Sequence, residues 1–518
     1  MSNNYIDKLF CRGYLISERD LSDITAYPFL EYFNMHKFGR YYIYIHKEQH
    51  FYYYGDDNSV LFLIGNCINP FTMQYNEIEI VNELFNKTKQ KNQLCIDTIN
   101  EFTGDFFIGY IHNNNISFIT DPTEMLFCTY AIIDERLYLS SHYQLIADIF
   151  QLEKDNYTKR FESYRFFYKY GLFFPGDRTP YSEIKRALTN HLYNYSEKSI
   201  SYIRIFPTKE IHECTNEIEY TALIEKIHSI LKNTLICASN KWNTPAISLT
   251  GGMDSKTTLA ATNGLEDKFF YYSYCSMPGD KIDADAAHEI AQHIGVNHTI
   301  FNISDNDDDF PEIEKQREIL QHNNGGYTCN KNDVRKRAFF NTQKPFEVEI
   351  KSWISEIGRA NYYKKFGLKK MPDKLSPRQM TSMYKIFLTE RKLAKETDNI
   401  FQEFINKSGF DNLPIGYDAS DMYLWEFRYS AWGGIVITSE HSYSNEIFIP
   451  YNNRLLIDLM LTAPKNKRIS DEFHEDIIKY GNPKISETGI TITNWNETKS
   501  RQIIEKFYFL LHSFFKKF

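Results

Sequence analysis

The chain has 518 residues, of which 42% are hydrophobic and 24% charged, a globular composition that excludes disorder as the dominant state. Its net charge is −8 and no basic stripe stands out, which argues against nucleic acid as a partner. No apolar run is long enough to span a membrane, and the N-terminus lacks the pattern of a signal peptide. We therefore expect a cytoplasmic protein of about two large domains or roughly three to four small ones.

The first part of the chain predicts a strand-rich region, because short alternating apolar runs are bounded by Asn, Gly and Asp. Phe106–Ile111 and Ile116–Thr120 flank an Asn-rich turn and predict a hairpin. Further strands are predicted at Arg40–His46, at Val60–Ile64, at Leu137–Ser140 and within Tyr193–Arg204. We expect an antiparallel sheet domain that ends near Pro207.

From about residue 218 the pattern changes to alternating helices and strands. Such alternation predicts a parallel α/β sheet that is covered on both faces, and the chain beyond about residue 370 is mostly helical by pattern. The predicted elements are a helix at Ile218–Ser239, a strand at Ala246–Leu249, a helix at Ser255–Thr262, a strand at Phe269–Cys275, a helix at Ala284–Ile294 and a strand at Thr299–Ile303.

The strongest functional signal lies where the strand at Ala246–Leu249 gives way to a helix. Adjacent glycines let backbone N–H groups approach an anion, and a helix N-terminus adds its positive dipole end. The hydroxyls donate hydrogen bonds, and a carboxylate here can reach Mg²⁺ that bridges phosphates. A Gly-Gly pair before a helix is often only a turn, but the whole pattern predicts a nucleotide site. The residues expected to bind it are Ser248, Leu249, Thr250, Gly251, Gly252, Asp254 and Ser255.

This segment lacks the Walker pattern GxxxxGK[ST] and resembles the pyrophosphate-binding PP-loop, S-G-G-x-D-S, of ATP pyrophosphatases. Enzymes with this loop cleave ATP between the α and β phosphates, adenylate a substrate oxygen and release pyrophosphate. The resemblance implies ATP and Mg²⁺ as cofactors.

Four further segments resemble the asparagine synthetase-like family, and their order and spacing extend the resemblance over most of the chain. It implies a glutaminase-like, Ntn-hydrolase-like α+β domain with antiparallel sheet at residues 1–210. It also implies an α/β PP-loop synthetase domain with a parallel sheet and many helices at residues 211–518. The segments are Phe102–Phe107 (F-x-G-D-F), Phe118–Pro122, Phe174–Leu188 with His191-Leu192, and Ile282–His298.

The N-terminal domain departs from class II glutamine amidotransferases, which use a Cys at position 2 as an N-terminal nucleophile. Position 2 is Ser, and Cys11 would be terminal only after removal of ten residues. The eight cysteines form no CxxC pair, so we expect reduced thiols and no zinc ribbon. We therefore expect no glutaminase activity and a structural N-terminal domain, as in the β-lactam synthetase branch and the lasso-peptide cyclases that it resembles.

The family's second acidic motif, G-E-G-x-D-E, has its counterpart at Ser355–Arg359, after a predicted strand at Phe346–Ile350. Glu356 keeps the first carboxylate and is expected to ligate the metal together with Asp254. Arg359 replaces an Asp. It either contacts a phosphate or an acidic substrate through its bidentate fork, which we favour, or marks a decayed position in a protein that no longer turns over ATP.

The family also needs a lysine near the C-terminus, but its R-x-K-x-G-F segment is not recognisable here. Lys484 and Lys499 are the candidates, and Lys499, with Arg501 nearby, is preferred because a compact charge must lie near the developing oxyanion.

Three other segments each have two interpretations. Glu446–Arg454 resembles the family's E-x-R-x-P-F-L-D segment, or is a buried strand-to-helix turn. Trp425–Arg428 faces the same cleft, or its Glu and Arg form a structural salt bridge. The apolar stripe of Arg501–Phe518, which includes Ile504, Phe507, Leu511 and Phe514, docks on the core, or attaches to a membrane or partner enzyme.

The leading hypothesis is an ATP-dependent, AMP-forming amide ligase with Lys499, Lys484, Glu356 and Arg359 as catalytic residues. Its partners would be a small-molecule or peptide carboxylate, such as a sugar uronic acid, an amino acid or a peptide being cyclised, and an amine or ammonia. A second copy of the chain, forming a homodimer, is another expected partner. The alternative is an inactive nucleotide-binding scaffold of the same fold. Sulfur transfer to tRNA is disfavoured, because neither a catalytic Cys pair nor a basic surface is evident.

Overall fold

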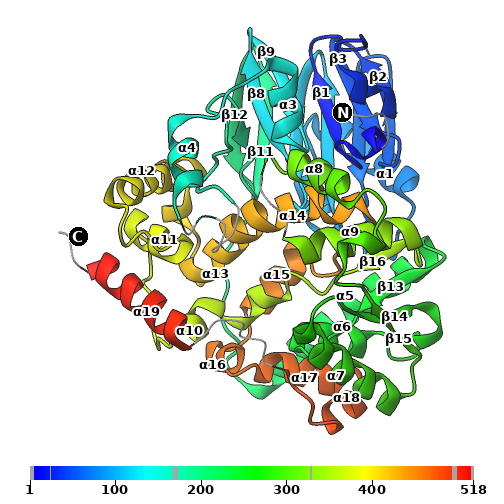
Figure 1. Cartoon of the computed structure of the whole chain (residues 1–518), viewed down its shortest axis with the longest axis vertical. Helices are drawn as coiled ribbons and strands as arrows, with labels where there is room; N and C mark the ends of the chain where they lie inside the picture. Colours follow the sequence, from blue (N-terminus) through cyan, green and yellow to red (C-terminus); the bar gives the residue numbers. More distant parts are fainter. Residues whose placement is uncertain are drawn as a thin grey trace.

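The computed structural model describes residues 5–514 except 24, 166, 168–172, 327–329 and 493–498, and these described residues form three β-sheets. Two antiparallel sheets lie within residues 14–204, and one parallel sheet lies within residues 245–448 (Figure 1). The predicted division into an antiparallel first part and a parallel second part is therefore confirmed. The boundary at residue 210 stays a prediction, because one hydrophobic core extends through both parts.

The first antiparallel sheet has the strand order β10-β8-β9-β1-β3-β2. Its central strand β1 pairs with β3 on one side and with β9 on the other. The strands at Arg40–His46 and Leu137–Ser140 are confirmed as β3 and β9, whereas β1, β2, β8 and β10 were not predicted. The strands are β1 (Tyr14–Ser17), β2 (Phe33–Phe38), β3 (Tyr41–His46), β8 (Thr129–Ile133), β9 (Arg136–Ser140) and β10 (Lys185–Arg186).

The second antiparallel sheet has the order β12-β11-β7-β6-β5-β4 and contains the predicted hairpin. Its turn residues Asn113 and Asn114 have φ values of 48° and 62°, the left-handed backbone that a tight hairpin needs and Asn tolerates. The stretch Tyr193–Arg204 forms two strands of this sheet rather than one. The strands are β4 (Phe51–Gly55), β5 (Ser59–Gly65), β6 (Phe106–His112), β7 (Asn115–Thr120), β11 (His191–Ser196) and β12 (Ser199–Arg204).

The two antiparallel sheets pack face to face, with a helix on each outer face. Aromatic side chains fill the space between the sheets: the Phe107 ring lies 5.2 Å from Tyr14 and 5.4 Å from Phe118. On the outer face of the first sheet, Tyr138 contacts Phe150 of α3 (Tyr143–Phe150). A separate core joins the second sheet to α1 (Glu77–Lys91). Much of the aromatic excess of the composition is thus core packing.

The parallel sheet has the order β15-β14-β13-β16-β17, and its elements match the predicted alternation. Two helices begin earlier than predicted: α7 starts at Pro278, a favoured first helical residue, and α6 starts at Met253. The strands are β13 (Pro245–Ser248), β14 (Phe270–Cys275), β15 (His298–Asn302), β16 (Val348–Ile350) and β17 (Glu446–Phe448). The helices of this region are α5 (Glu217–Lys241), α6 (Met253–Ala261), α7 (Pro278–Ile294), α8 (Ile313–Asn323) and α9 (Lys331–Gln343).

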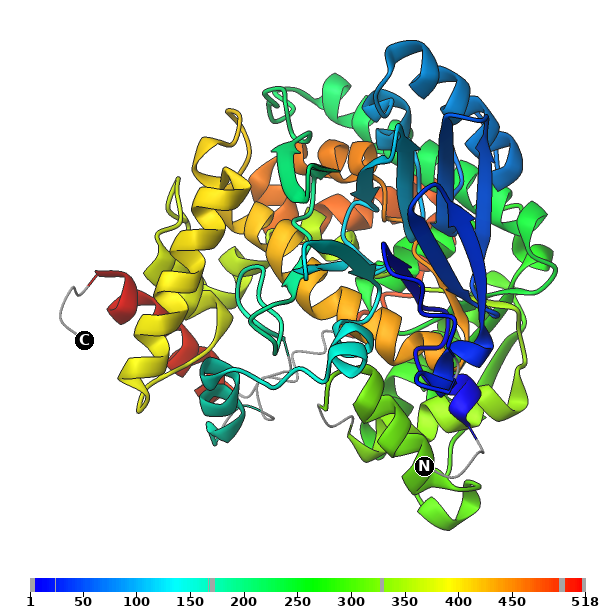
Figure 2. The same ribbon diagram turned by 90° about the horizontal axis from the view of Figure 1, so that it is seen from above.

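The rest of the chain is mostly helical, as predicted. Seen from above, α12 and the C-terminal helix α19 lie on the side away from the blue N-terminal strands (Figure 2). No helix of the described residues is long and apolar enough to cross a membrane. The helices are α10 (Asn361–Phe366), α11 (Pro377–Tyr384), α12 (Arg391–Ser408), α13 (Ala419–Tyr423), a π-helix (Leu424–Gly433), α14 (Gly434–Ser439), α15 (Arg454–Leu461), α16 (Lys465–Ile469), α17 (Glu472–Gly481), α18 (Pro483–Glu487) and α19 (Lys499–Phe514); α2 (Ile96–Asn100) and α4 (Asn156–Ser163) belong to the first part.

Helix α19 docks on the core, but not through the apolar stripe that the sequence suggested. Phe509 is buried and stacks on Phe366 of α10 with ring centroids 4.4 Å apart. Ile504 and Phe507 of the stripe remain exposed, at 47% and 61% of their surface. The helix packs mainly against α10 and α11, and these two residues lie on its exposed face. Phe515 and Phe518 lie outside the described residues.

Buried polar contacts join the two parts of the chain. Arg186 donates to Glu124 at 2.5 Å and to Ser430 of the π-helix at 2.9 Å, and both charged side chains are almost fully buried. Asn452 donates to the Gly104 carbonyl at 2.7 Å and to Asp121 at 2.8 Å. The segment Glu446–Arg454 therefore follows the second interpretation, a buried strand-to-helix turn.

Candidate active site

The Gly-Gly loop lies at the carboxyl edge of the parallel sheet, between β13 and α6. In open α/β sheets ligands bind at this edge. Gly252 is the N-cap of α6 and provides no side-chain cap, so the first-turn amides of the helix keep their donor capacity. An anion bound here would accept hydrogen bonds from these amides and would lie at the positive end of the helix dipole.

Hydrogen bonds of two of the predicted hydroxyl groups fix the conformation of the loop. The Thr250 and Ser255 hydroxyl oxygens lie 2.9 Å apart, and the Ser255 hydroxyl also donates to the Thr250 carbonyl at 2.9 Å. The Gly252 amide donates to the Thr250 hydroxyl oxygen at 3.1 Å. A Cβ at Gly251 would lie 2.4 Å from Ile492, so glycine is needed there to let the C-terminal segment approach. The loop is therefore formed before any ligand arrives.

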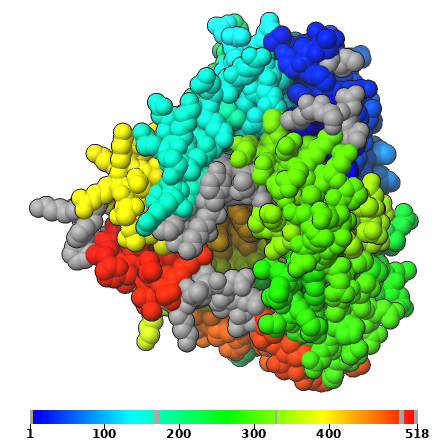
Figure 3. Space-filling model, viewed as in Figure 1, coloured from blue at the N-terminus to red at the C-terminus, as the bar shows by residue number. Residues whose placement is uncertain are grey.

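A cleft of about 350 Å³ opens beside this loop, and Figure 3 shows that the same face of the molecule is hollowed between α19 and the green elements. The loop, α7, the 3₁₀-helix Ser355–Arg359, α10 and the start of α17 contribute its walls. Ser248 and Leu249 do not line it, and Leu249 is buried in the core. The lining residues are Thr250, Gly252, Met253, Asp254, Asp283, Glu356, Arg359, Asn361, Lys364, Asp471, Thr491 and Ile492.

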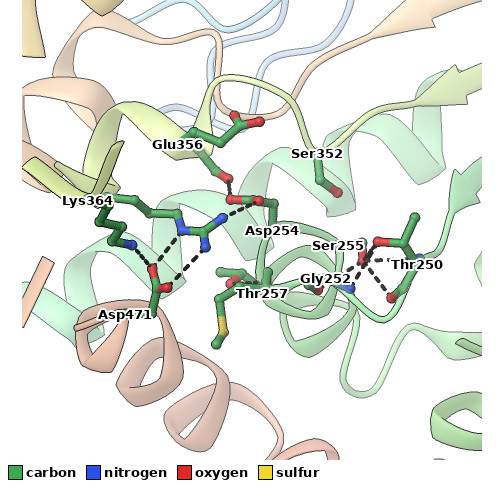
Figure 4. Close-up of polar contacts among 12 residues, drawn as sticks. Thr250, Gly252, Asp254, Ser255, Thr257, Ser352, Glu356, Lys364 and Asp471 are labelled. Atoms are coloured by element: carbon green, nitrogen blue, oxygen red, sulfur yellow. Dashed lines mark hydrogen bonds and ion pairs between the residues drawn. The ribbon is translucent and has the colours of Figure 1, made fainter. Parts of the chain in front are cut away.

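Arg359 is the centre of the polar network in the cleft. Its Nη1 donates to Asp254 Oδ2 at 2.7 Å, and its Nε and Nη2 donate to Asp471 at 2.7 and 3.1 Å. Ser355 donates to the other oxygen of Asp254, and Lys364 also pairs with Asp471. Figure 4 shows Lys364 and Asp471 on one side of Asp254 and the loop residues on the other.

Charges in the cleft shift the pKa values of its groups. Burial by itself would raise the pKa of Asp471, but the hydrogen bonds and charges of Arg359 and Lys364 outweigh it and lower that pKa. Burial, and then the Arg359 charge, lower the pKa of Lys364. Arg359 and Lys364 are thus held by Asp471, and Arg359 also by Asp254, so the two cations are fixed in place at this wall of the cleft.

Glu356 is the most perturbed carboxyl of the cleft. Burial, followed by the nearby Asp254 charge, raises its pKa to about 7, although the Tyr429 hydroxyl donates to it at 2.5 Å. A carboxyl that titrates near neutral pH is suited to proton transfer.

This pKa predicts a pH dependence of stability. The folded-state pKa lies above the unfolded value, so between about pH 4.5 and 7 the folded state holds a proton that the unfolded state has lost. The free energy of unfolding should therefore fall as pH rises through this window. In a Glu356→Gln variant this contribution disappears, so the difference between native and variant protein, measured by urea unfolding at each pH, should change across the window. A difference that is constant with pH would contradict the prediction.

Several predicted site residues are not in the cleft. Lys484 is exposed on α18 and does not line it, and the side chain of Lys499, the first residue of α19, lies outside the described residues. Glu426 forms a structural salt bridge through two bonds of 2.5 and 2.9 Å, but with Arg204 and not with Arg428 of its own segment. Arg428 lines a different cavity.

The sequence interpretation missed Lys364, Asp471 and Tyr429. Lys364 follows Arg359 by five residues, so its position near the motif was a usable signal. Asp471 and Tyr429 lie in helical regions more than seventy residues away along the chain, where no local pattern distinguishes them.

Cys11 does not resemble an available nucleophile in this fold. It is 2% exposed, and burial raises the pKa of its thiol despite the nearby Arg12 and Lys8 charges. Because the thiolate is the reactive form, this environment makes the residue inert. Ser2 lies outside the described residues.

No protein-family model matches this sequence, and no curated protein matches it. Among solved structures, this chain is similar to the glutamine-dependent NAD⁺ synthetase from Acinetobacter baumannii in complex with ADP, at 14% identity over 34% of each chain with a TM-score of 0.19. It is similar to an allosteric regulatory enzyme of purine biosynthesis at 9% identity over 70% of this chain and 72% of that chain (TM-score 0.25). The glutamine phosphoribosylpyrophosphate amidotransferase from B. subtilis complexed with ADP and GMP matches at 7% over 76% and 74% (TM-score 0.20). TM-scores this low carry no argument, so the function must be inferred from the cleft itself.

Proposed function

We propose that this protein is an ATP-dependent, AMP-forming ligase that activates a carboxylate for attack by an amine or ammonia. One observation carries the proposal: a preformed Gly-Gly loop at a helix N-terminus faces a cleft whose described lining has four carboxylates, Asp254 and Glu356 among them, and two cations, Arg359 and Lys364. These groups are suited to bind a nucleotide whose β- and γ-phosphates leave as pyrophosphate.

The cations would receive the pyrophosphate. Phosphate oxygens would compete with Asp254 and Asp471 for the guanidinium of Arg359, whose planar fork suits bidentate phosphate contacts. Lys364, a compact charge in the same wall, would stabilise the oxyanion in place of Lys484, which does not line the cleft; Lys499 stays a candidate.

Asp254 and Glu356 would hold Mg²⁺ that arrives with the nucleotide. Mg²⁺ is usually bound by one or two protein carboxylates together with substrate phosphates, and the cleft offers these two. The described residues include no group of three or more His, Cys, Asp or Glu that could hold a metal ion by themselves, which suits an ion carried by ATP. When bound, Mg²⁺ would neutralise phosphate charge.

The reaction would proceed in two steps. A substrate carboxylate oxygen attacks the α-phosphorus, so that a carboxylate–phosphorus bond forms and the bond to the pyrophosphate leaving group breaks. An amine or ammonia then attacks the acyl carbon, an amide forms and AMP leaves. The proton that the amine loses would pass to solvent, because Glu356 would hold Mg²⁺ as an ionised carboxylate. A sugar uronic acid, an amino acid and a peptide carboxylate are the acceptor classes.

Pyrophosphate release tests this proposal. The protein should release pyrophosphate and AMP, in equal amounts, from Mg-ATP in the presence of its carboxylate and an amine. Coupled assays across panels of uronic acids, amino acids and peptides measure both products. A folded protein that releases neither with any panel, and that binds no ATP by calorimetry, would contradict the proposal.

A second candidate is a nucleotide-binding scaffold without turnover. The ion pair of Arg359 with Asp254 favours it, because a guanidinium occupies a carboxylate that a metal would need. In this case calorimetry would show ATP or AMP binding without pyrophosphate release, and an Asp254→Asn change would leave the biological output intact. Joint loss of output and pyrophosphate release in that variant would exclude the scaffold.

A further inference from the structure

The outward side of the C-terminal helix α19 is apolar. Ile503, Ile504 and Phe507 are exposed at 67%, 47% and 61% of their surface. The buried residues of the helix include Tyr508 and Phe509, so at 3.6 residues per turn the three exposed side chains point away from the core. A single exposed apolar side chain is common, but three on one side of a helix form a patch. We call Ile503, Ile504 and Phe507 the outer face of α19.

A basic segment packs beside this helix. Between residues 361 and 395 the sequence has ten Lys or Arg and two Asp or Glu, although the whole chain carries a net charge of −8. The segment contains α10, α11 and the start of α12, and α19 packs on α10 and α11 (Figure 1). The overall charge therefore conceals a local excess of cations. The exposed basic residues of the segment are Lys369, Lys370, Lys374, Arg391, Lys392 and Lys395.

The described contacts place basic residues on both sides of α19. On one side, Lys506 donates to the Gly367 carbonyl at 3.4 Å, at the end of α10, where the exposed lysines of the basic segment follow. On the other side, a surface pocket between α19 and the start of α12 is lined by Arg391 and Lys395. Leu388, which is 58% exposed, lines the same pocket and extends the apolar surface. Cations thus flank an apolar helix face.

Acidic groups near this surface are held by other partners. Glu396 accepts two hydrogen bonds from Arg160, at 2.7 and 2.6 Å. Asp398 lines the pocket, and one of its carboxylate oxygens lies 3.5 Å from the His512 ring. The two acidic residues of the basic segment itself are outnumbered by its six exposed cations. The surface around the outer face of α19 is therefore positively charged.

We propose that the outer face of α19 and the basic segment bind the surface of an anionic phospholipid bilayer. An interfacial helix places its apolar side chains at the boundary of the acyl chains and its cations among the headgroups. Here Ile504 and Phe507 would enter the apolar layer, and Arg391, Lys395 and Lys506 would meet lipid phosphates.

Charge complementarity identifies the occupant as anionic, and the apolar side chains between the cations favour a bilayer over nucleic acid. Nucleic acid offers phosphates to such cations but no apolar layer for Ile503 and Phe507. The proposal goes beyond the ligase function and does not need a nucleotide in the cleft.

Vesicle flotation of the native chain tests the proposal. The two probes are vesicles of phosphatidylcholine and vesicles of equal parts phosphatidylcholine and phosphatidylglycerol. The chain should bind the anionic vesicles and not the neutral ones. Salt at about 1 M, which shortens the Debye length to about 3 Å, should weaken this binding severalfold. Absence of binding to the anionic vesicles, or equal binding to both kinds, would overturn the proposal.

Variants at exposed side chains locate the binding surface without disturbing the fold. Phe507→Ser should weaken binding at least fivefold, because it removes apolar surface from the interface. Arg391→Gln/Lys395→Gln should weaken it at least tenfold, because two cations no longer meet the anionic headgroups. Ile218→Ser and Lys226→Gln, at exposed residues of α5, are the matched controls and should change nothing. Binding that survives both test variants would overturn the proposal.

A second copy of the chain is the competing occupant of the outer face of α19. Light scattering of the native chain and of Phe507→Ser distinguishes the two. A native dimer that dissociates in Phe507→Ser would place the second copy on this face and overturn the proposal, whereas an oligomeric state that the variant leaves unchanged supports it. Failure of pyrophosphate release alone would contradict the ligase function and leave bilayer binding standing.

Discussion

Replacing Asp254 with Asn is expected to lower pyrophosphate release by at least about 100-fold, the scale on which loss of one preorganised electrostatic group affects catalysis. Asp254 is the carboxylate at the loop that would face the phosphates of the proposed nucleotide, and it is held by Ser355 and Arg359. Asn keeps the shape and removes the charge. Because Arg359 retains its two bonds to Asp471, the free energy of unfolding should change by only about 1 kcal/mol.

A matched control separates this effect from general charge loss. Asp285 is exposed on α7, which also borders the cleft, and pairs only with Lys281 among the described residues. Asp285→Asn should leave pyrophosphate release unchanged. Steady-state release rates and urea unfolding of both variants measure the two quantities. An Asp254→Asn variant that retains a third or more of the native rate would refute the assigned role.

Replacing Arg186 with Met is expected to lower the free energy of unfolding by about 3–5 kcal/mol. The Arg186 side chain is 2% exposed and that of Glu124 is fully buried, and Arg186 also donates to Ser430 and to the Gly176 carbonyl. Removing the guanidinium leaves these buried acceptors without their hydrogen-bond donor. Burial raises the pKa of Glu124 against the opposing charge of Arg186, so loss of Arg186 should raise that pKa further.

The double variant Arg186→Met/Glu124→Leu should recover most of that loss, because neither charge then remains buried. The surface pair Lys198–Glu135, with side chains 60% and 73% exposed, is the control. Lys198→Met should change the free energy of unfolding by less than about 1 kcal/mol. Urea unfolding at pH 7 measures all three. If the double variant is no more stable than Arg186→Met, the buried charge is not the cause.

The sequence pattern predicted those elements whose signal is local. The hairpin of β6 and β7 and the alternation from α5 to β15 were confirmed, because alternating apolar residues, Asn turns and helical spacing act within a few residues. Strand β1 was missed although its four residues are all buried. Four residues, three of them apolar, are a weaker signal than the seven residues of β5, which is also fully buried and was predicted, and the place of β1 follows from its pairing with β3 and β9.

The candidate site likewise has one part that the local sequence predicts and another that depends on distant segments. The Gly-Gly loop and Asp254 could be predicted, because a strand, two glycines and a helix start are adjacent in sequence. The ion pairs of Arg359 could not, since Asp471 lies 112 residues further along the chain. The two sequence interpretations of Arg359 differ in what its side chain contacts. One of those contacts is Asp471, the residue just before α17, so the place where α17 begins decides it.

Length, composition and motif spacing by themselves determined a two-part chain with a Gly-Gly loop between a strand and a helix in its parallel-sheet half. Tertiary structure decided which charges meet: Arg359 with Asp254 and Asp471, Lys364 in the cleft in place of Lys484, and cations on both sides of α19. The physical reason is that loop conformation and helix starts depend on neighbouring residues, whereas burial and charge pairing depend on segments that meet only when the whole chain has folded.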